Sequence, residues 1–104
     1  MLMVLVLTTV SSDVVGEEIA TTLVTEHLAA CVNIGGPMTS VYRWKGNVER
    51  ETERQLVIKT TRDRVAAVRQ RIKELHSYEL PEFIVIEAGA SDEYLAWVNN
   101  ESCS

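Results

Sequence analysis

The residue with the most distinctive chemistry is His76, which stands a few positions before two carboxylate side chains. Glu79 and Glu82 follow it on either side of Pro81. An imidazole nitrogen with nearby carboxylate oxygens is a donor set that Cu²⁺ and Zn²⁺ accept, although the spacing differs from that of a tight His/Cys zinc motif. A histidine at the C-terminal end of a helix is also favoured in its charged form by the helix dipole. That structural role is the simpler explanation, and metal binding by His76 and Glu82 is the alternative.

Cys31 and Lys59 are two further candidates. Cys31 enters an apolar segment, where its thiolate would be a soft ligand for Cu(I), whereas a buried thiol behaves as a small hydrophobe, which is the more usual state. Lys59 ends the apolar run 56–58 and, by strand alternation, shares a face with Val57. Its ammonium group suits either a ligand-binding cleft or an ion pair.

Length and composition restrict the class of protein. A chain of 104 residues suits a single domain over residues 1–104, and 46% apolar with 24% charged residues is typical of a globular protein. Fifteen acids against ten bases give a net charge of −5, which argues against partners such as nucleic acid or anionic membrane, because no cationic excess is present. No Ser/His/Asp or Cys/His constellation stands out, so we expect no enzyme.

The ends of the chain indicate a cellular compartment. The apolar run 2–7 lacks the basic region and cleavage site of a signal peptide, and it is far shorter than the ~20 residues that span a bilayer. Two cysteines, Cys31 and Cys103, are too few for a disulfide scaffold and suit a reducing compartment. We therefore expect a cytoplasmic protein.

Hydrophobic periodicity predicts the elements that must position these side chains. Strands are expected over 2–8, 31–34, 38–44, 48–60 and 83–86, and helices over 13–28, 62–75 and 91–99. Residues 35–37, Gly-Gly-Pro, interrupt the second strand, and residues 45–47, Lys-Gly-Asn, form a turn. Counting 31–44 as one interrupted strand, the order is β-α-β-β-α-β with a short C-terminal helix. This order is typical of an α+β, ferredoxin-like sandwich, in which both main helices cover one face of an antiparallel four-stranded sheet.

The hairpin between the second and third strands is too long for a domain of this size. A compact chain of this length has a diameter of roughly 33 Å. A straight strand from Asn47 to Thr60 would run roughly 45 Å. The outer part carries Tyr42 and Trp44 among charged residues, and an isolated hairpin is marginally stable in water. We expect the hairpin to project and to dock against other copies of the chain; a hairpin bent back onto its own subunit is the alternative.

Six short motifs resemble the CutA family of divalent-cation tolerance proteins. They are AACVN (29–33), SVYRWKG (40–46), ETE (51–53), KTT (59–61), HSYELPE (76–82) and YLAW (94–97). The match covers nearly the whole chain in the same order and spacing. The resemblance implies a cytosolic bacterial or organellar ferredoxin-like homotrimer with β-sheet contacts between subunits. It also implies a link to copper and other divalent cations, and no established enzyme activity.

The resemblance carries over to individual residues. It matches His76, whereas Thr8 and Leu75 stand where family members suspected of copper binding have a cysteine and a second histidine. Cys31 and Glu82 complete the candidate metal ligands. The resemblance also matches a second group of residues and so implies an intersubunit cleft for an anion or small ligand. This group comprises Lys59, Tyr42, Trp44 and Tyr78, with Glu82 nearby.

Two other functions fit the same fold. Trimeric signalling proteins of the nitrogen-regulatory type bind nucleotides in intersubunit clefts, but residues 35–37 are too short for a phosphate loop and hold no lysine. A scaffold that anchors another protein is the second alternative. Acylphosphatases share the topology but need an arginine and a phosphate-cradling loop after the first strand, and residues 8–13 contain neither arginine nor glycine.

Overall fold

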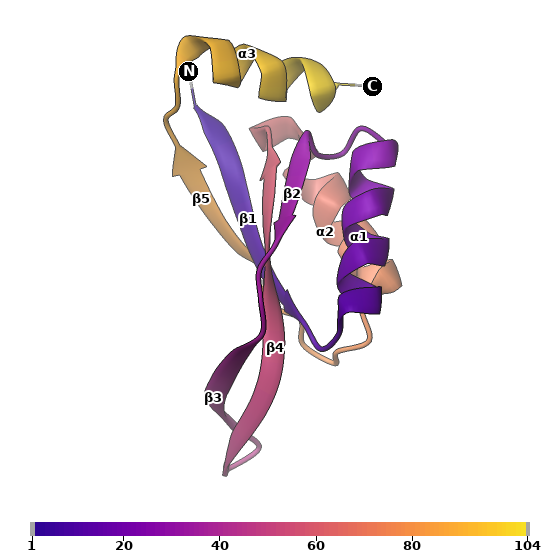
Figure 1. The fold of residues 1–104 in the computed structure, drawn as a ribbon, viewed down its shortest axis with the longest axis vertical. Helices are drawn as coiled ribbons and strands as arrows, with labels where there is room; N and C mark the ends of the chain where they lie inside the picture. The colour runs from indigo at the N-terminus through magenta and orange to yellow at the C-terminus, as the bar shows by residue number, and fades with distance from the viewer. Residues whose placement is uncertain (1, 104) are drawn as a thin grey trace.

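The computed structural model describes residues 2–103, which form one five-stranded sheet and three α-helices (Figure 1). In chain order the elements are β1 (Met3–Val10), α1 (Asp13–Thr25), β2 (Cys31–Ile34), β3 (Met38–Trp44), β4 (Asn47–Thr60), a 3-10 turn (Arg62–Arg64), α2 (Val65–Leu75), β5 (Ile84–Ala88) and α3 (Asp92–Glu101). The predicted β-α-β-β-α-β order with a short C-terminal helix is confirmed.

The sheet is antiparallel throughout, in the order β2-β4-β1-β5, and β3 pairs with the outer half of β4. β4 is therefore the longest strand, because its inner half lies between β1 and β2 and its outer half forms the hairpin with β3. Gly35 is the point at which the chain passes from β2 to β3. A side chain there would meet the Gln55 carbonyl oxygen at 3.3 Å, and the Gly35 N–H donates to that same oxygen.

The principal core lies between one face of the sheet and the helices α1 and α2 (Figure 1). Its fully buried members are Ala29, which precedes β2, and residues of four elements: Val4, Val6 and Val10 of β1, Leu56 and Ile58 of β4, Ile19 and Leu23 of α1, and Val68 and Ile72 of α2. Burying a branched side chain of this kind contributes about 1.5–3 kcal/mol, so this face of the sheet fixes the fold.

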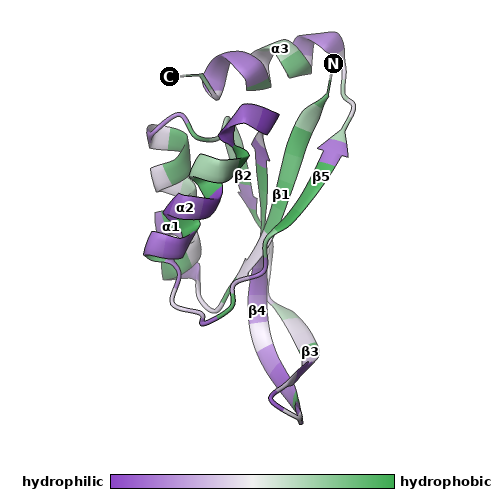
Figure 2. Ribbon diagram, turned by 180° about the vertical axis from the view of Figure 1, so that it is seen from behind, coloured by the Kyte–Doolittle hydropathy of each residue, from purple (hydrophilic) through white to green (hydrophobic). Residues whose placement is uncertain are grey.

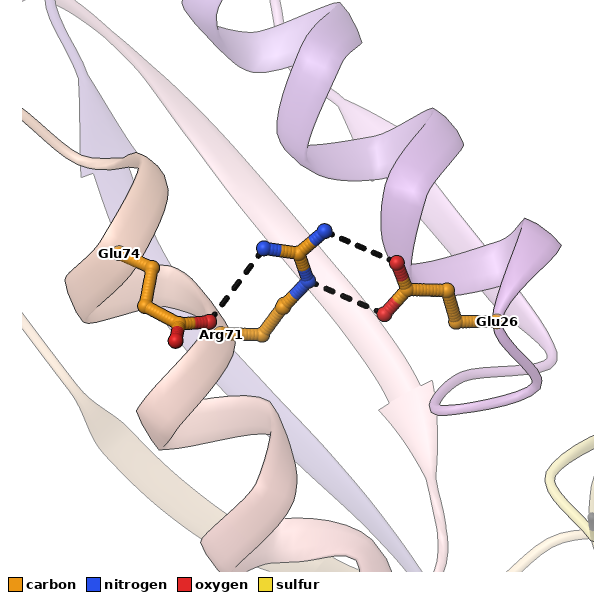
Figure 3. A network of polar contacts seen from close by, with 3 residues as sticks. All are labelled: Glu26, Arg71 and Glu74. Atoms are coloured by element: carbon orange, nitrogen blue, oxygen red, sulfur yellow. Dashed lines mark hydrogen bonds and ion pairs between the residues drawn. The ribbon is translucent and has the colours of Figure 1, made fainter.

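A bidentate ion pair joins the ends of the two helices (Figure 3). The guanidinium of Arg71 on α2 donates to both carboxylate oxygens of Glu26, which follows α1, at 3.0 and 2.9 Å. Its third contact is Glu74, one turn along α2, at 3.3 Å. The hydrogen bonds from Arg71 lower the pKa of Glu26.

The hairpin of β3 and β4 projects from the rest of the molecule, as predicted (Figure 1). The molecule measures 44 × 24 × 23 Å, and the hairpin accounts for the extra length. Its turn is made by Lys45 and Gly46, whose φ angles are 49° and 84°. Figure 2 shows that the projecting part is largely hydrophilic, whereas β1 and β5 are strongly hydrophobic.

The second face of the sheet is covered at one end by α3, which packs Leu95 and Val98 against Met3 and Ala30. Farther along this face, the register aligns a row of side chains across four strands: Asn33, Val57, Leu7 and Ile84. Ile84 and Ile86 of β5 are 45% and 42% exposed there. We call this apolar surface the open face. None of the helices in residues 2–103 is both long and apolar enough to span a membrane.

The side chain of Thr8 leads to a stability prediction. Thr8 is fully buried in β1, and its hydroxyl has no hydrogen-bond partner within the described chain. We expect Thr8→Val to raise the free energy of unfolding by about 1 kcal/mol, because valine has the same shape and no unsatisfied polar atom. The measurement is the urea midpoint at unchanged m-value.

Thr60→Val is the matched control. Thr60 is equally buried, but its hydroxyl donates to the Leu28 carbonyl oxygen at 2.7 Å. The loss of this hydrogen bond in Thr60→Val should lower the free energy of unfolding by about 1 kcal/mol. A Thr8→Val variant that is destabilised to the same extent would mean that the Thr8 hydroxyl has a partner after all.

Candidate functional site

Acidic and aromatic side chains line a pocket of about 430 Å³ along one face of the hairpin. Four structural parts contribute to it, and we call it the acidic pocket. Its lining residues are Met38, Ser40, Tyr42 and Trp44 of β3, Glu51 and Glu53 of β4, Tyr78, Glu79, Leu80 and Glu82 of the 76–83 loop, and Thr9 of β1.

The strand register explains why the hairpin presents these side chains together. Met38 lies opposite Glu53 and Ser40 lies opposite Glu51. Because side chains alternate along a strand, the even-numbered residues of β3 and the odd-numbered residues of β4 point to the same face of the ribbon. Tyr42 continues that series, so one face of the hairpin carries both aromatic rings and carboxylates.

The 76–83 loop forms the opposite wall, and His76 attaches it to β1. The Nε2 of His76 lies 2.6 Å from the Thr9 carbonyl oxygen, and the Tyr78 N–H donates to Nδ1 at 3.1 Å. A carbonyl oxygen only accepts, so Nε2 carries the hydrogen and Nδ1 provides the lone pair. Both ring nitrogens are therefore occupied by hydrogen bonds that hold the loop.

Two further contacts hold the loop to the hairpin. The Tyr78 hydroxyl donates to Oε2 of Glu53 at 2.8 Å. At the hairpin tip, the ammonium of Lys45 lies 3.6 Å from a carboxylate oxygen of Glu79. The loop is thus attached at the sheet, at the base of the hairpin and near its turn.

The acidic pocket carries uncompensated negative charge. Burial, and then the charge of Glu53, raise the pKa of Glu82. Its Oε2 is completely buried and accepts no hydrogen bond from the described residues. Burial and the hydrogen bond to Glu53 raise the pKa of Tyr78. Partial desolvation and the neighbouring carboxylates, Glu51 foremost, likewise raise the pKa of Tyr42.

Comparisons with known proteins give the family. The model of the CutA1 divalent ion tolerance protein family matches residues 4–101. The chain belongs to the CutA1 family. The divalent-cation tolerance protein CutA of Thermus thermophilus is 43% identical over 98 residues, which cover 93% of this chain and 95% of that protein. The chloroplastic CutA of Arabidopsis thaliana is 37% identical over 95% of this chain, which spans 55% of that longer protein.

A solved structure supports the same assignment. The Thermus thermophilus Cut A1 structure superposes with a TM-score of 0.93 at 42% identity and covers 95% of this chain and 97% of that one. The predicted CutA resemblance and the ferredoxin-like fold class are confirmed. The CutA names describe tolerance of divalent cations.

The structure brings together only some of the residues predicted for the site. Tyr42, Trp44, Tyr78 and Glu82 all line the acidic pocket. Lys59 does not, because it lies six residues beyond Glu53 on β4, about 20 Å along the strand. Its ammonium instead lies over the Tyr94 ring of α3, 5.7 Å from the centroid.

The three candidate metal ligands do not meet within one subunit. Cys31 pairs with Lys59 in the sheet register, so it lies at the end of the sheet that is farther from the acidic pocket and Glu82. His76 is beside the acidic pocket, but its nitrogens are engaged as described above. Across residues 2–103, no three His, Cys, Asp or Glu side chains converge closely enough to hold a metal ion. A His/Cys copper site therefore does not fit a single subunit.

Sequence reasoning missed Glu51 and Glu53 as pocket residues. Their spacing of two in a strand puts both carboxylates on one face, which was a usable signal. The 76–83 loop lies opposite this face of the hairpin and is joined to it by the Tyr78–Glu53 hydrogen bond. Residue spacing does not reveal such a long-range contact.

The raised pKa of Glu82 predicts a pH-dependent effect of Glu82→Gln. A carboxyl group whose pKa is raised on folding destabilises the folded state once the pH exceeds its ordinary value of 4.5. Glu82→Gln removes the charge, so the variant should be more stable than the native chain at pH 7. The difference should vanish as the pH falls below 4.5, because both side chains are then neutral. Urea unfolding at a series of pH values measures this, and a constant difference down to pH 3 would contradict the assigned cause.

Proposed function

We propose that this protein is a cytoplasmic homotrimer of the divalent-cation tolerance family that binds cations in the acidic pocket and performs no catalysis. The lining of the pocket is the observation that carries the proposal. Four glutamates line it, and no lysine, arginine or histidine among the described residues does so. The family name and the charge of the pocket therefore point to the same class of ligand, a cation.

The pair formed by Glu53 and Glu82 supports this reading most directly. The charge of Glu53 contributes to the raised pKa of Glu82, so the two carboxyl groups repel each other. A cation between them would remove that repulsion. One or two carboxylates with retained water molecules are a common environment for hydrated divalent ions such as Mg²⁺. Copper, the ion that the resemblance puts first, would meet these carboxylates and not His76.

The homotrimer is supported by two surfaces that a single subunit leaves uncovered. The open face exposes Ile84 and Ile86, and the projecting hairpin exposes Val41 and Val48 at 57% and 67%. Exposed apolar side chains on the open face, together with the two exposed valines of the hairpin, favour contact with another protein surface. The number three comes from the resemblance to the CutA family.

A nucleotide-binding signalling role is disfavoured for this pocket, because phosphate groups would face glutamates and no cationic side chain. A pure scaffold would leave the acidic pocket without a ligand. Both alternatives are outcomes of the experiment that tests the proposal.

The experiment is calorimetric titration of the purified oligomer with Mg²⁺, Cu²⁺ and ATP in separate runs. The native chain should give saturable heat with the divalent ions and none with ATP. The double variant Glu53→Gln/Glu82→Gln should bind the ions at least about tenfold more weakly. The matched control is Glu17→Gln/Glu18→Gln, which removes two exposed charges from α1. It should behave like the native chain.

Each contrary outcome identifies a different function. Ion binding that survives the pocket double variant but is lost in His76→Ala would show a histidine metal site. Saturable ATP binding would favour the signalling alternative. The absence of binding heat with every titrant would favour a scaffold. Each of these three results overturns the proposal.

A further inference from the structure

We propose that the acidic pocket binds an aliphatic polyamine, with ammonium groups placed on its aromatic and carboxylate walls. The inference rests on the proposed function only in placing the ligand in this pocket. It goes further by naming an organic cation as the best-fitting ligand class.

The aromatic walls are the first observation. Tyr42 and Trp44 come from β3, and Tyr78 comes from the 76–83 loop. An ammonium group within about 6 Å of such a ring is attracted by the negative face of the π-system. Divalent ions such as Mg²⁺, which keep much of their water shell, gain little from such walls.

The chain's own Lys45 demonstrates this chemistry at the edge of the pocket. Its ammonium lies 5.6 Å from the centroid of the Trp44 ring and 3.6 Å from a carboxylate oxygen of Glu79. An amine held between an aromatic ring and a carboxylate is thus already present beside the pocket. A ligand amine would make the same pair of contacts farther in.

The charge of the pocket calls for more than one ammonium group. Glu79 is paired with Lys45, but Glu51, Glu53 and Glu82 form no ion pair in the part of the chain that the structure describes. One oxygen of Glu82 is buried without a hydrogen-bond partner. Several carboxylates on two walls match a chain that carries several separated positive charges.

The remaining lining suits the methylene segments of such a chain. Met38 lies at the base of the hairpin, and Leu80 lies in the loop opposite. A volume of about 430 Å³ is within the usual range of small-molecule pockets. No three carboxylates of the described residues converge on one point, as a metal held mainly by protein ligands would require, whereas a polyamine contacts them separately.

The test is calorimetric titration with spermidine and putrescine in about 0.15 M salt, where surface attraction is largely screened. We expect saturable binding that is tighter for spermidine. Glu53→Gln keeps an acceptor for the Tyr78 hydroxyl and removes one charge, and it should weaken binding about tenfold. Trp44→Leu should weaken it about fivefold, with Trp44→Phe intermediate because that variant retains a ring.

Two further variants test whether the pocket is responsible. Lys45→Gln removes the resident ammonium and should strengthen spermidine binding several-fold. Glu17→Gln, which removes an exposed charge on α1, should leave it unchanged. Far-ultraviolet circular dichroism checks that each variant is folded. The tryptophan emission, to which Trp44 and Trp97 both contribute, should change on saturation of the native chain.

If spermidine gives no saturable heat, the inference is overturned. It is also overturned if the native chain and both Trp44 variants bind spermidine equally well, because binding would then be simple charge attraction. The two proposals fail in distinguishable ways. If the chain binds Mg²⁺ but not spermidine, the proposed function is retained and the polyamine inference is wrong. If the chain binds spermidine but no divalent ion, the polyamine inference is retained and divalent-ion binding in the pocket is wrong.

Discussion

Replacing Ile86 by aspartate is expected to separate the proposed trimer into single subunits. Ile86 lies on the open face of β5, 42% exposed, in register with Leu5 of β1. In an assembly that covers this face, each copy of the variant would bury a carboxylate among apolar side chains. Burying an unpaired charge costs several kcal/mol, so we expect association to weaken by roughly a thousandfold.

Light scattering at several concentrations measures the effect. The native protein should have three times the 11.6 kDa mass of one chain, and Ile86→Asp should approach the mass of one. Glu87→Gln is the matched control, because Glu87 is the next residue of β5 and forms its ion pair with Arg62 before α2. A native monomer would contradict the proposed assembly. If the Ile86→Asp variant is still a trimer, the subunit interface is formed by the hairpin and not by the open face.

Local sequence signals predicted most of the fold. The strand expected over 2–8 became β1, and the helices expected over 13–28 and 91–99 became α1 and α3. These signals act over a few residues, and in the structure Ser12 and Ser91 cap the two helices. The two caps accept hydrogen bonds from Val15 and Tyr94. The helix expected over 62–75 was less accurately predicted, because residues Arg62–Arg64 form a 3-10 turn and α2 begins only at Val65.

The candidate site could be predicted only in part, because it depends on contacts between distant segments. Alternation correctly put Lys59 on the face of Val57, but it could not say that the ammonium turns to Tyr94 on α3. The resemblance grouped Tyr42, Trp44 and Tyr78, whereas strand spacing alone could not reveal that Tyr78 would oppose the other two rings. The overhang of the hairpin was predictable, since it needed only the length of β4 and the size of a compact domain.

The second large effect is expected for His76→Ala, which should lower the free energy of unfolding by about 2–3 kcal/mol. The imidazole bridges two segments 67 residues apart: it donates to the Thr9 carbonyl oxygen and accepts from the Tyr78 N–H. Alanine removes both hydrogen bonds and the ring contact with Tyr78, whose centroid lies 4.4 Å away. The 76–83 loop then loses its attachment to β1, so cation binding in the acidic pocket should weaken as well.

Urea unfolding in the absence of metal separates this role from metal ligation. The matched control is His27→Asn, which replaces the other histidine at an exposed position with φ of 59°, a conformation that asparagine adopts readily. It should change stability by less than about 0.5 kcal/mol. A His76→Ala variant that is as stable as the native chain without metal, yet loses a large metal-dependent stabilisation, would identify His76 as a ligand. Because both ring nitrogens already hold backbone groups, we expect the loss of stability to be present in full before any cation is added.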